Sequence, residues 1–150
     1  MKPSPRDEGM RWQIQAQHDL EGARYLNDGK MYNLACFLAQ QAAEKAIKSY
    51  LYAQGQTLVI GHSVARLCQE ALEFDTEFEA LRTRAAPLDK YYIPTRYPNG
   101  LPGGIPAEAF DEVDASRALE LADYVIEFVG SRFPSAEEAT RHDAEGENDG

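Results

Sequence analysis

The sequence predicts an all-α protein, an up-down bundle of four long helices plus one short helix. Its 150 residues include 21 Ala, 13 Leu and 15 Glu, which favour helices. Val, Ile and Thr, which favour strands, contribute only 16 residues together. A content of 43% hydrophobic and 27% charged residues is that of a folded domain, and no apolar run is long enough to cross a membrane.

The first two helices are indicated by apolar residues at helical spacing and by a glycine after each. The first is predicted over roughly residues 8–28, before Gly29. The second is predicted from about Tyr32 to Gln54, before Gly55. Its expected core face consists of small and aromatic residues: Tyr32, Ala35, Ala39, Ala42, Ala43, Ala46 and Tyr50. So many alanines on one face allow a neighbouring helix to approach closely.

The remaining helices are separated by a short loop and a long one. Ser63 is placed to cap a short third helix. A fourth helix is predicted from a three-four spacing, with Pro87 expected to kink or divide it; the spaced residues are Phe78, Leu81, Ala85, Leu88 and Tyr92. Residues 94–106 contain four prolines and three glycines, which predicts a long loop.

The fifth helix is predicted to open at Glu108 or Asp111 and to end before Pro134. Its apolar residues are expected to point inward: Val113, Ala118, Leu121, Val125, Phe128 and Val129. Together the five segments account for one domain over residues 1–134, with no internal repeat.

The formal charge of −10 is distributed unevenly along the chain. Half of it falls on residues 135–150, which carry six acids against one Arg and show no apolar periodicity. We therefore expect a disordered acidic tail over residues 135–150. The acidic average also argues against duplex DNA as a ligand, because DNA-binding proteins usually present a broad basic surface.

Cys36 and Cys68 lie among apolar residues and fit neither a disulfide framework nor a metal-ligand spacing. We expect them to be core residues, and we expect neither a metal ion nor a cofactor. Residues 1–6 lack the apolar stretch of a secretory signal, which predicts a cytoplasmic protein without membrane contact.

One stretch of the chain is basic. Residues 82–98 hold four cations and a single acid, and residues 89–98 add three tyrosines. Aromatic rings can stack on a base while an arginine binds phosphate through two parallel hydrogen bonds, so Arg96 and Tyr97 are candidate nucleotide ligands. Alternatively, Tyr91 or Tyr92 belongs to the core and Arg96 pairs with an acid of the last helix, such as Asp114 or Glu120.

The second helix carries a polar stripe, formed by Gln41, Glu44, Lys45 and Lys48. A solvent-exposed, salt-bridged face explains this stripe by itself. Large apolar residues flank it, however, which favours a subunit interface, and we expect Leu34, Phe37 and Leu51 to lie exposed there. His62, at the mouth of the third helix, either satisfies a free helix-end group or faces a ligand.

Several blocks together resemble the HEPN family over about residues 8–133. They are Asp19-Leu20 with Ala23, the run Ala39–Lys48 (AQQAAEKAIK), Gly61-His62-Ser63, the run Tyr92–Pro98 (YIPTRYP) and Asp114-Ala115. The resemblance implies a four- to five-helix bundle that forms homodimers and acts with a small nucleotidyltransferase, encoded separately or fused.

Many members of the family that this chain resembles are metal-independent ribonucleases, in which an Arg is followed by a His after about four to six residues. Such a pair is suited to acid–base catalysis and to phosphate stabilisation. In this chain no His follows Arg96 before the tail. The resemblance therefore favours the branch that binds nucleotides or acts with a nucleotidyltransferase.

The sequence thus predicts a homodimer that binds a nucleotide or an RNA phosphate beside a nucleotidyltransferase. The expected ligand-binding residues are Arg96, Tyr97, Lys45, Lys48, Gln41 and His62. One alternative is the ribonuclease toxin of a toxin–antitoxin pair, in which Tyr97 or His62 transfers the proton beside Arg96. The other is a non-catalytic interaction module whose second helix binds the partner.

Overall fold

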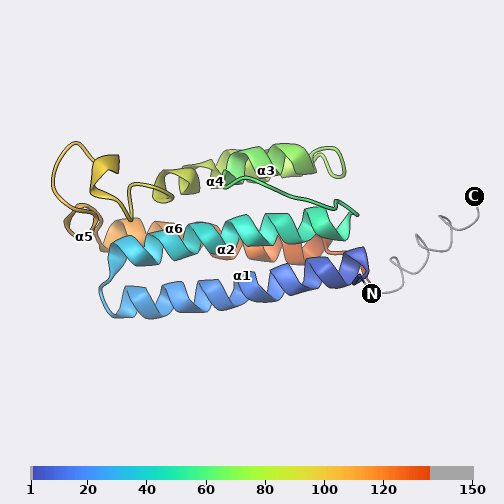
Figure 1. The fold of residues 1–150 in the computed structure, drawn as a ribbon, viewed down its shortest axis with the longest axis horizontal. Helices are drawn as coiled ribbons and strands as arrows, with labels where there is room; N and C mark the ends of the chain where they lie inside the picture. The colour runs from blue at the N-terminus through green and yellow to red at the C-terminus, as the bar shows by residue number, and fades with distance from the viewer. Residues whose placement is uncertain (1, 136–150) are drawn as a thin grey trace, which may run out of the picture.

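Three long helices lie side by side in the computed structural model, which describes residues 2–135 (Figure 1). They are α1 (Pro5–Asp28), α2 (Tyr32–Ala53) and α6 (Glu112–Arg132). The shorter α3 (Val64–Ala71) and α4 (Phe78–Ala85) form a layer over the other side of α2 and α6. Because the described residues contain helices and no strand, the predicted all-helical fold is confirmed.

The helices begin at the polar residues that the sequence indicates. Ser63 Oγ accepts a hydrogen bond from the backbone N–H of Arg66 at 3.1 Å, as a cap of α3 should. At the start of α6, Asp111 and Asp114 form a reciprocal capping box. The Asp114 backbone N–H that bonds Asp111 lowers the pKa of the Asp111 carboxyl. Both predicted caps are therefore confirmed.

The predicted fourth helix is divided beside Pro87, as the sequence indicated, so only three helices of the bundle within residues 2–135 are long. After α4 the chain continues as a 3₁₀ helix, η1 (Ala86–Tyr91), which begins where Pro87 has no N–H to donate. A 3₁₀ helix has 3.0 residues per turn. The buried residues therefore follow at three-residue spacing, as Ala85, Leu88 and Tyr91. As a result Tyr91 lies in the core, and Tyr92 is left at its edge.

The loop predicted over residues 94–106 contains a single 3₁₀ turn, η2 (Pro98–Gly100), and leads into a one-turn helix, α5 (Pro106–Ala109). In the following α6, Val113 is 75% exposed, so the prediction that it points inward is wrong. The inward face begins at Ala115. Val113 precedes Ala115 by two residues, which correspond to about 200° of rotation around a helix, so Val113 points to the opposite side.

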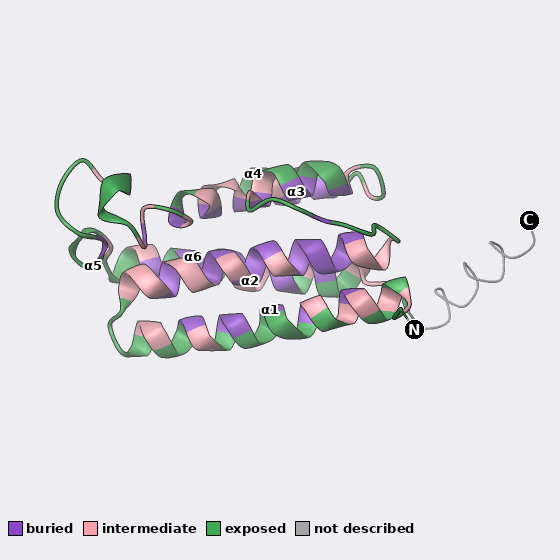
Figure 2. Cartoon of the chain, in the orientation of Figure 1, coloured by how far each residue is buried: buried purple, intermediate pink, exposed green. Residues whose placement is uncertain are grey.

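Buried residues are concentrated on α2, between α1 and the α3–α4 layer (Figure 2). The core between the long helices is built largely from alanine, so the helices approach closely. Ten alanines there are fully buried: Ala16, Ala23, Ala35, Ala39, Ala42, Ala43, Ala46, Ala115, Ala118 and Ala122. The closest approach is at Gly9, where an added Cβ would lie 2.5 Å from the carbonyl oxygen of Ser49. Larger side chains fill the space toward α3 and α4, among them Ile47, Leu67, Phe78, Leu81 and Leu88.

Cys36 and Cys68 are core residues, as predicted, and burial raises the pKa of each thiol to about 12. No helix within residues 2–135 has the length and apolar character needed to cross a membrane. Residues 136–150, to which most of the predicted acidic tail belongs, lie outside the described part of the chain.

Candidate functional site

Arg96 follows η1 in a turn that is tied to the start of α2. The hydroxyl of the fully buried Thr95 donates to the Tyr91 carbonyl oxygen at 2.6 Å. The Thr95 carbonyl oxygen in turn accepts from Nδ2 of Asn33, in the first turn of α2, at 3.0 Å. The Arg96 backbone N–H donates to the Ile93 carbonyl oxygen at 3.1 Å. These bonds fix the Arg96 backbone relative to the core.

The Arg96 side chain is held by one hydrogen bond and three aromatic rings. Its Nε donates to the Tyr92 carbonyl oxygen at 2.9 Å. The guanidinium carbon lies 4.2 Å from the ring centre of Phe37, 4.6 Å from that of Tyr92 and 5.1 Å from that of Tyr97. Such cation–π contacts hold the guanidinium without neutralising it. Within residues 2–135 its two terminal nitrogens, Nη1 and Nη2, have no hydrogen-bond or ion-pair partner.

The alternative in which Arg96 pairs with an acid of the last helix is wrong. Glu120 forms its ion pair with Arg84, at 3.9 Å, and Asp114 is occupied in the capping box of α6. Arg96 is thus a partly buried cation with no acidic partner among the described residues.

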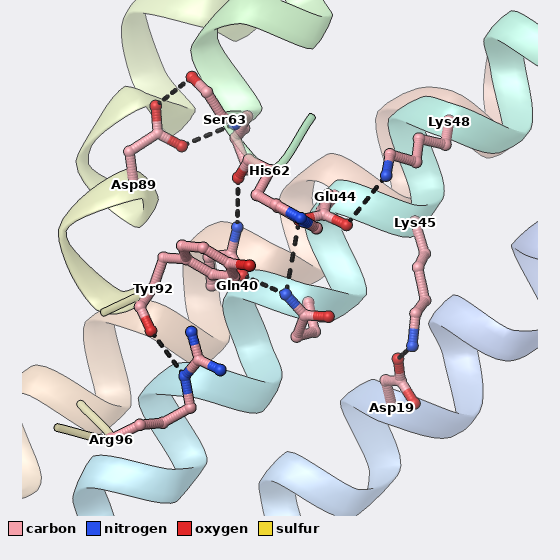
Figure 3. Close-up of polar contacts among 12 residues, drawn as sticks. Asp19, Gln40, Glu44, Lys45, Lys48, His62, Ser63, Asp89, Tyr92 and Arg96 are labelled. Atoms are coloured by element: carbon pink, nitrogen blue, oxygen red, sulfur yellow. Dashed lines mark hydrogen bonds and ion pairs between the residues drawn. The ribbon is translucent and has the colours of Figure 1, made fainter. Parts of the chain in front are cut away.

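His62, in the loop before α3, contacts the same Tyr92 ring as Arg96 (Figure 3). Its carbonyl oxygen accepts from Nε2 of the fully buried Gln40 at 2.8 Å. Its ring stacks on Tyr92, with 4.7 Å between ring centres, and its Nδ1 lies 3.0 Å from Oε1 of Glu44. Because a carboxylate only accepts hydrogen bonds, Nδ1 carries the proton. Nε2 has no partner among residues 2–135, and the His62 side chain is 55% exposed.

The Glu44 carboxylate is the centre of a buried polar network. Its Oε2 pairs with Nζ of Lys48 at 3.3 Å, and the two side chains are only 4% and 7% exposed. Its Oε1 also receives Nε2 of Gln41 at 3.5 Å, and that amide donates to Oε1 of Gln40 at 2.8 Å. Lys48 Nζ further lies 5.7 Å from the ring centre of Trp12. The polar stripe of α2 is therefore not a solvent-exposed face at Glu44 and Lys48.

Asp89 connects the two loops that supply His62 and Arg96. Its Oδ2 accepts from the Ser63 hydroxyl at 2.7 Å, and its Oδ1 accepts from the Val64 backbone N–H at 2.6 Å. Since Asp89 belongs to η1, these bonds join the start of α3 to the segment that carries Tyr92 (Figure 3). They hold His62 against the Tyr92 ring.

Five of the six predicted ligand-binding residues are brought together, and we call this group with its supporting residues the Arg96–His62 cluster: Arg96, Tyr97, His62, Gln41 and Lys48, with Phe37, Tyr92, Gln40 and Glu44. Lys45 lies apart from it. Its Nζ pairs with Oδ2 of Asp19 on α1 at 2.5 Å, directed away from His62 (Figure 3).

The residues expected at a subunit interface are only partly available. Leu51 is 1% exposed and belongs to the core, so the expectation that it lies exposed is wrong. Phe37 is half-buried because Arg96 and Tyr92 lie against its ring. Leu34 is also half-buried.

Sequence reasoning missed Gln40 and Tyr92 as members of the site and assigned Phe37 only to an interface. A signal for Gln40 does exist, because it is a polar residue on the alanine-rich face of α2, four residues before Glu44. No pattern indicated the stacking of Tyr92 on His62. Among residues 2–135 no group of three or more His, Cys, Asp or Glu side chains could hold a metal ion.

Comparison with known proteins agrees with this architecture. The model of the HEPN domain family matches residues 10–133. The structure of TT1696 from Thermus thermophilus is 41% identical in sequence, with a TM-score of 0.76, and the match covers 83% of this chain and 97% of that one. An archaeal HEPN homologue, ST0689, is 36% identical with a TM-score of 0.70, over 89% of this chain and 100% of that one.

No curated protein matches the sequence. The family match nevertheless covers both loops of the Arg96–His62 cluster, α2, α6 and most of α1, and two solved structures share the fold at substantial identity. The chain therefore belongs to the HEPN domain family.

Proposed function

We propose that this HEPN protein binds a phosphate group of a nucleotide or of RNA at the Arg96–His62 cluster. The observation that carries the proposal is the state of Arg96, whose terminal nitrogens have no partner within residues 2–135 although aromatic rings hold the guanidinium in place. Two parallel N–H groups fit two phosphate oxygens. Tyr97 is 51% exposed and offers a ring on which a base can stack.

Titration of the full chain with AMP, ATP and a short single-stranded RNA tests this function. Lysine keeps the charge of Arg96 but loses the paired geometry, so Arg96→Lys should weaken binding by about ten- to a hundredfold, as expected for about 1.5–3 kcal/mol. Arg84→Lys is the matched control, because Arg84 also lies over a ring, that of Tyr124 at 3.8 Å, but has an acidic partner. Equal binding by both variants, or no binding by the unmodified chain, would refute the proposal.

The homodimer belongs to the same proposal, with α2 near Leu34 as its contact. Leu34→Glu is the appropriate test, because Phe37 also supports Arg96 and its substitution would disturb the site. Light scattering should give twice the 16.7 kDa mass of one chain for the unmodified protein and a mass closer to one chain for the variant. A single-chain mass for the unmodified protein contradicts the dimer.

Action beside a nucleotidyltransferase is supported by family membership alone. Its test is co-expression of this chain with a small nucleotidyltransferase encoded beside it, followed by purification through a tag on one of them. A stable complex at equal stoichiometry is the expected result, and separate elution of the two proteins would reject it.

A ribonuclease is the second candidate, and the geometry of His62 favours it. The imidazole is oriented by Glu44 at 3.0 Å and keeps Nε2 free, which is the arrangement of a general base. Nε2 would take the proton of a ribose 2′-hydroxyl while the 2′-oxygen of that ribose forms a bond to phosphorus. The bond to the 5′-oxygen would then break, leaving a 2′,3′-cyclic phosphate, and the departing oxygen would take a proton from water.

RNA cleavage with His62→Ala separates this candidate from simple binding. His18→Ala is the matched control, since His18 is an exposed histidine of α1 without a partner among the described residues. Loss of cleavage by about a hundredfold or more in the first variant only would support catalysis. Absence of cleavage by the unmodified chain leaves binding as the function of the cluster.

A further inference from the structure

A second surface feature involves none of the residues of the Arg96–His62 cluster and does not depend on it. It is a cleft of about 240 Å³ between the 56–61 segment and the end of α3. Its lining combines four apolar residues, two acids and one amide: Leu51, Leu58, Ile60, Phe74, Glu70, Glu73 and Gln56. We call it the 58–74 cleft.

The apolar groups of the cleft are exposed because the backbone holds them there. The Gln56 backbone N–H donates to the Leu51 carbonyl oxygen at 3.2 Å, and the Val59 N–H donates to the Tyr52 hydroxyl at 3.2 Å. Val59 is buried and anchors the segment, whereas its neighbours on either side, Leu58 and Ile60, are exposed.

The resulting exposure is large for such side chains. Leu58 is 75% exposed and Ile60 is 71% exposed, and Phe74 adds a third apolar group at 37%. Leu51, nearly fully buried, forms the floor between them. Large apolar side chains that cluster on a fixed backbone mark a surface for a partner.

The charges at the cleft are uncompensated. Neither the Glu70 nor the Glu73 side chain has an ion pair or hydrogen bond among residues 2–135, and no cation lines the cleft. By contrast, a hollow of about 520 Å³ beside Trp12 has charged residues that are already paired, Arg11 with Glu8 at 2.9 Å and Lys45 with Asp19 at 2.5 Å. Of these two hollows, the 58–74 cleft is the one that combines an apolar floor with carboxylates that have no partner among residues 2–135.

The size and charge of the cleft decide between possible occupants. A volume of 240 Å³ is below the roughly 300–1,000 Å³ of ordinary small-molecule pockets, so it suits one or two side chains of a polypeptide. A second copy bound symmetrically through the same surface would bring four carboxylates together, which like-charge repulsion opposes. The free acids instead match Lys or Arg.

We propose that the 58–74 cleft docks a segment of a partner protein that presents large apolar side chains together with Lys or Arg. The apolar side chains cover Leu58, Ile60 and Phe74, and the cations pair with Glu70 and Glu73. The cleft is lined by α2, α3 and the segments that flank α3, and it shares no residue with Arg96 and its rings.

The test is selection from a random peptide library against the immobilised full chain. We expect enriched peptides to combine large apolar residues with Lys or Arg. Their affinity should fall by more than about tenfold for the double variant Leu58→Ser/Ile60→Ser. It should fall by about three- to fivefold for Glu70→Gln/Glu73→Gln, with a weaker dependence on salt, as for exposed ion pairs.

Two matched controls exclude nonspecific attraction to an acidic protein. Val113→Ser removes an equally exposed apolar residue elsewhere, and Glu21→Gln/Glu127→Gln removes two exposed acids from other helices. Both controls should bind the peptides like the unmodified chain. The proposal is overturned if no peptide is enriched, if enriched peptides lack cations, or if the controls weaken binding as much as the cleft variants. Loss of a homodimer in Leu58→Ser/Ile60→Ser would overturn it in favour of a second copy.

Discussion

Replacement of Glu44 by glutamine should destabilise the fold by about 3 kcal/mol. Glu44 and Lys48 have side chains that are only 4% and 7% exposed, and their charged atoms are 3.3 Å apart. Removing one member of a buried pair typically costs about 3–5 kcal/mol, because the other charge stays buried without compensation. The lower end applies, since the glutamine oxygen still accepts a hydrogen bond from Lys48. Relative to a total stability of about 5–15 kcal/mol, this is a large loss.

Urea unfolding followed by helical circular dichroism measures this change. The double variant Glu44→Gln/Lys48→Met should recover about 2 kcal/mol, because it removes the buried charge itself. Glu21→Gln, at an exposed position of α1, should stay within about 0.5 kcal/mol of the unmodified chain. The pair would behave like a surface ion pair if the changes in unfolding free energy of the single and double variants were strictly additive. The same conclusion would follow from a loss below about 1 kcal/mol for Glu44→Gln.

Three further predictions concern other parts of the chain. Asp89→Asn should cost about 2 kcal/mol and also weaken ligand binding, because it removes charge-assisted bonds that join α3 to η1; unfolding with parallel titration measures both effects. Cys36 and Cys68 should not react with thiol reagents at pH 8 in the folded chain but should react fully in denaturant, as counted spectrophotometrically. Burial raises the pKa of both thiols in the folded chain from the ordinary value of 9.0 to about 12. The stabilising contribution of the buried, protonated thiols is therefore complete below pH 9.0 and is lost as the pH rises toward about 12. Deletion of residues 136–150 should leave the melting temperature unchanged, because the segment is acidic and offers no apolar face.

The helices could be predicted because their signals are local. Gly29 and Ser63 sit within one or two residues of the helix boundaries in the structure, and Asp111 caps α6. Apolar spacing found the inward face of α2, where Ala35, Ala39 and their neighbours are fully buried. Propensity, capping and periodicity point to the same element in each of these segments, and the fold class follows from them.

After Pro87 the buried positions of the fourth helix differ from the predicted ones, and the physical cause of this difference changes the site. Extrapolating a 3.6-residue period past Ala85 puts Tyr92 in the core, but Pro87 favours a 3₁₀ turn with a period of 3.0. The buried position moves to Tyr91, one residue earlier. Tyr92 is therefore free to stack on His62 and to support Arg96.

The site itself depends on contacts between distant residues, which no local pattern shows. His62 meets Glu44 across 18 positions, and Ser63 meets Asp89 across 26. The stripe on α2 has the spacing of an exposed salt-bridged face, but in the fold Glu44 contacts His62 of the loop before α3 and Lys48 lies against Trp12 of α1, and both are buried. Burial by another segment is a tertiary property, so the spacing alone left both interpretations open.

The position of α2 explains why its polar residues orient the site while the loops supply the groups that can bind. Because α2 is packed between α1, α6 and the α3–α4 layer, its buried polar side chains need hydrogen-bond partners. Gln40 and Glu44 form hydrogen bonds to His62, in the loop before α3. The loops lie at the edge, so Arg96 and His62 keep nitrogens without partners among the described residues. It follows that substitutions on α2 should change stability and binding together, whereas Arg96→Lys should change binding alone. If Arg96→Lys lowered the melting temperature as much as Glu44→Gln, Arg96 would be part of the scaffold and not a ligand of phosphate.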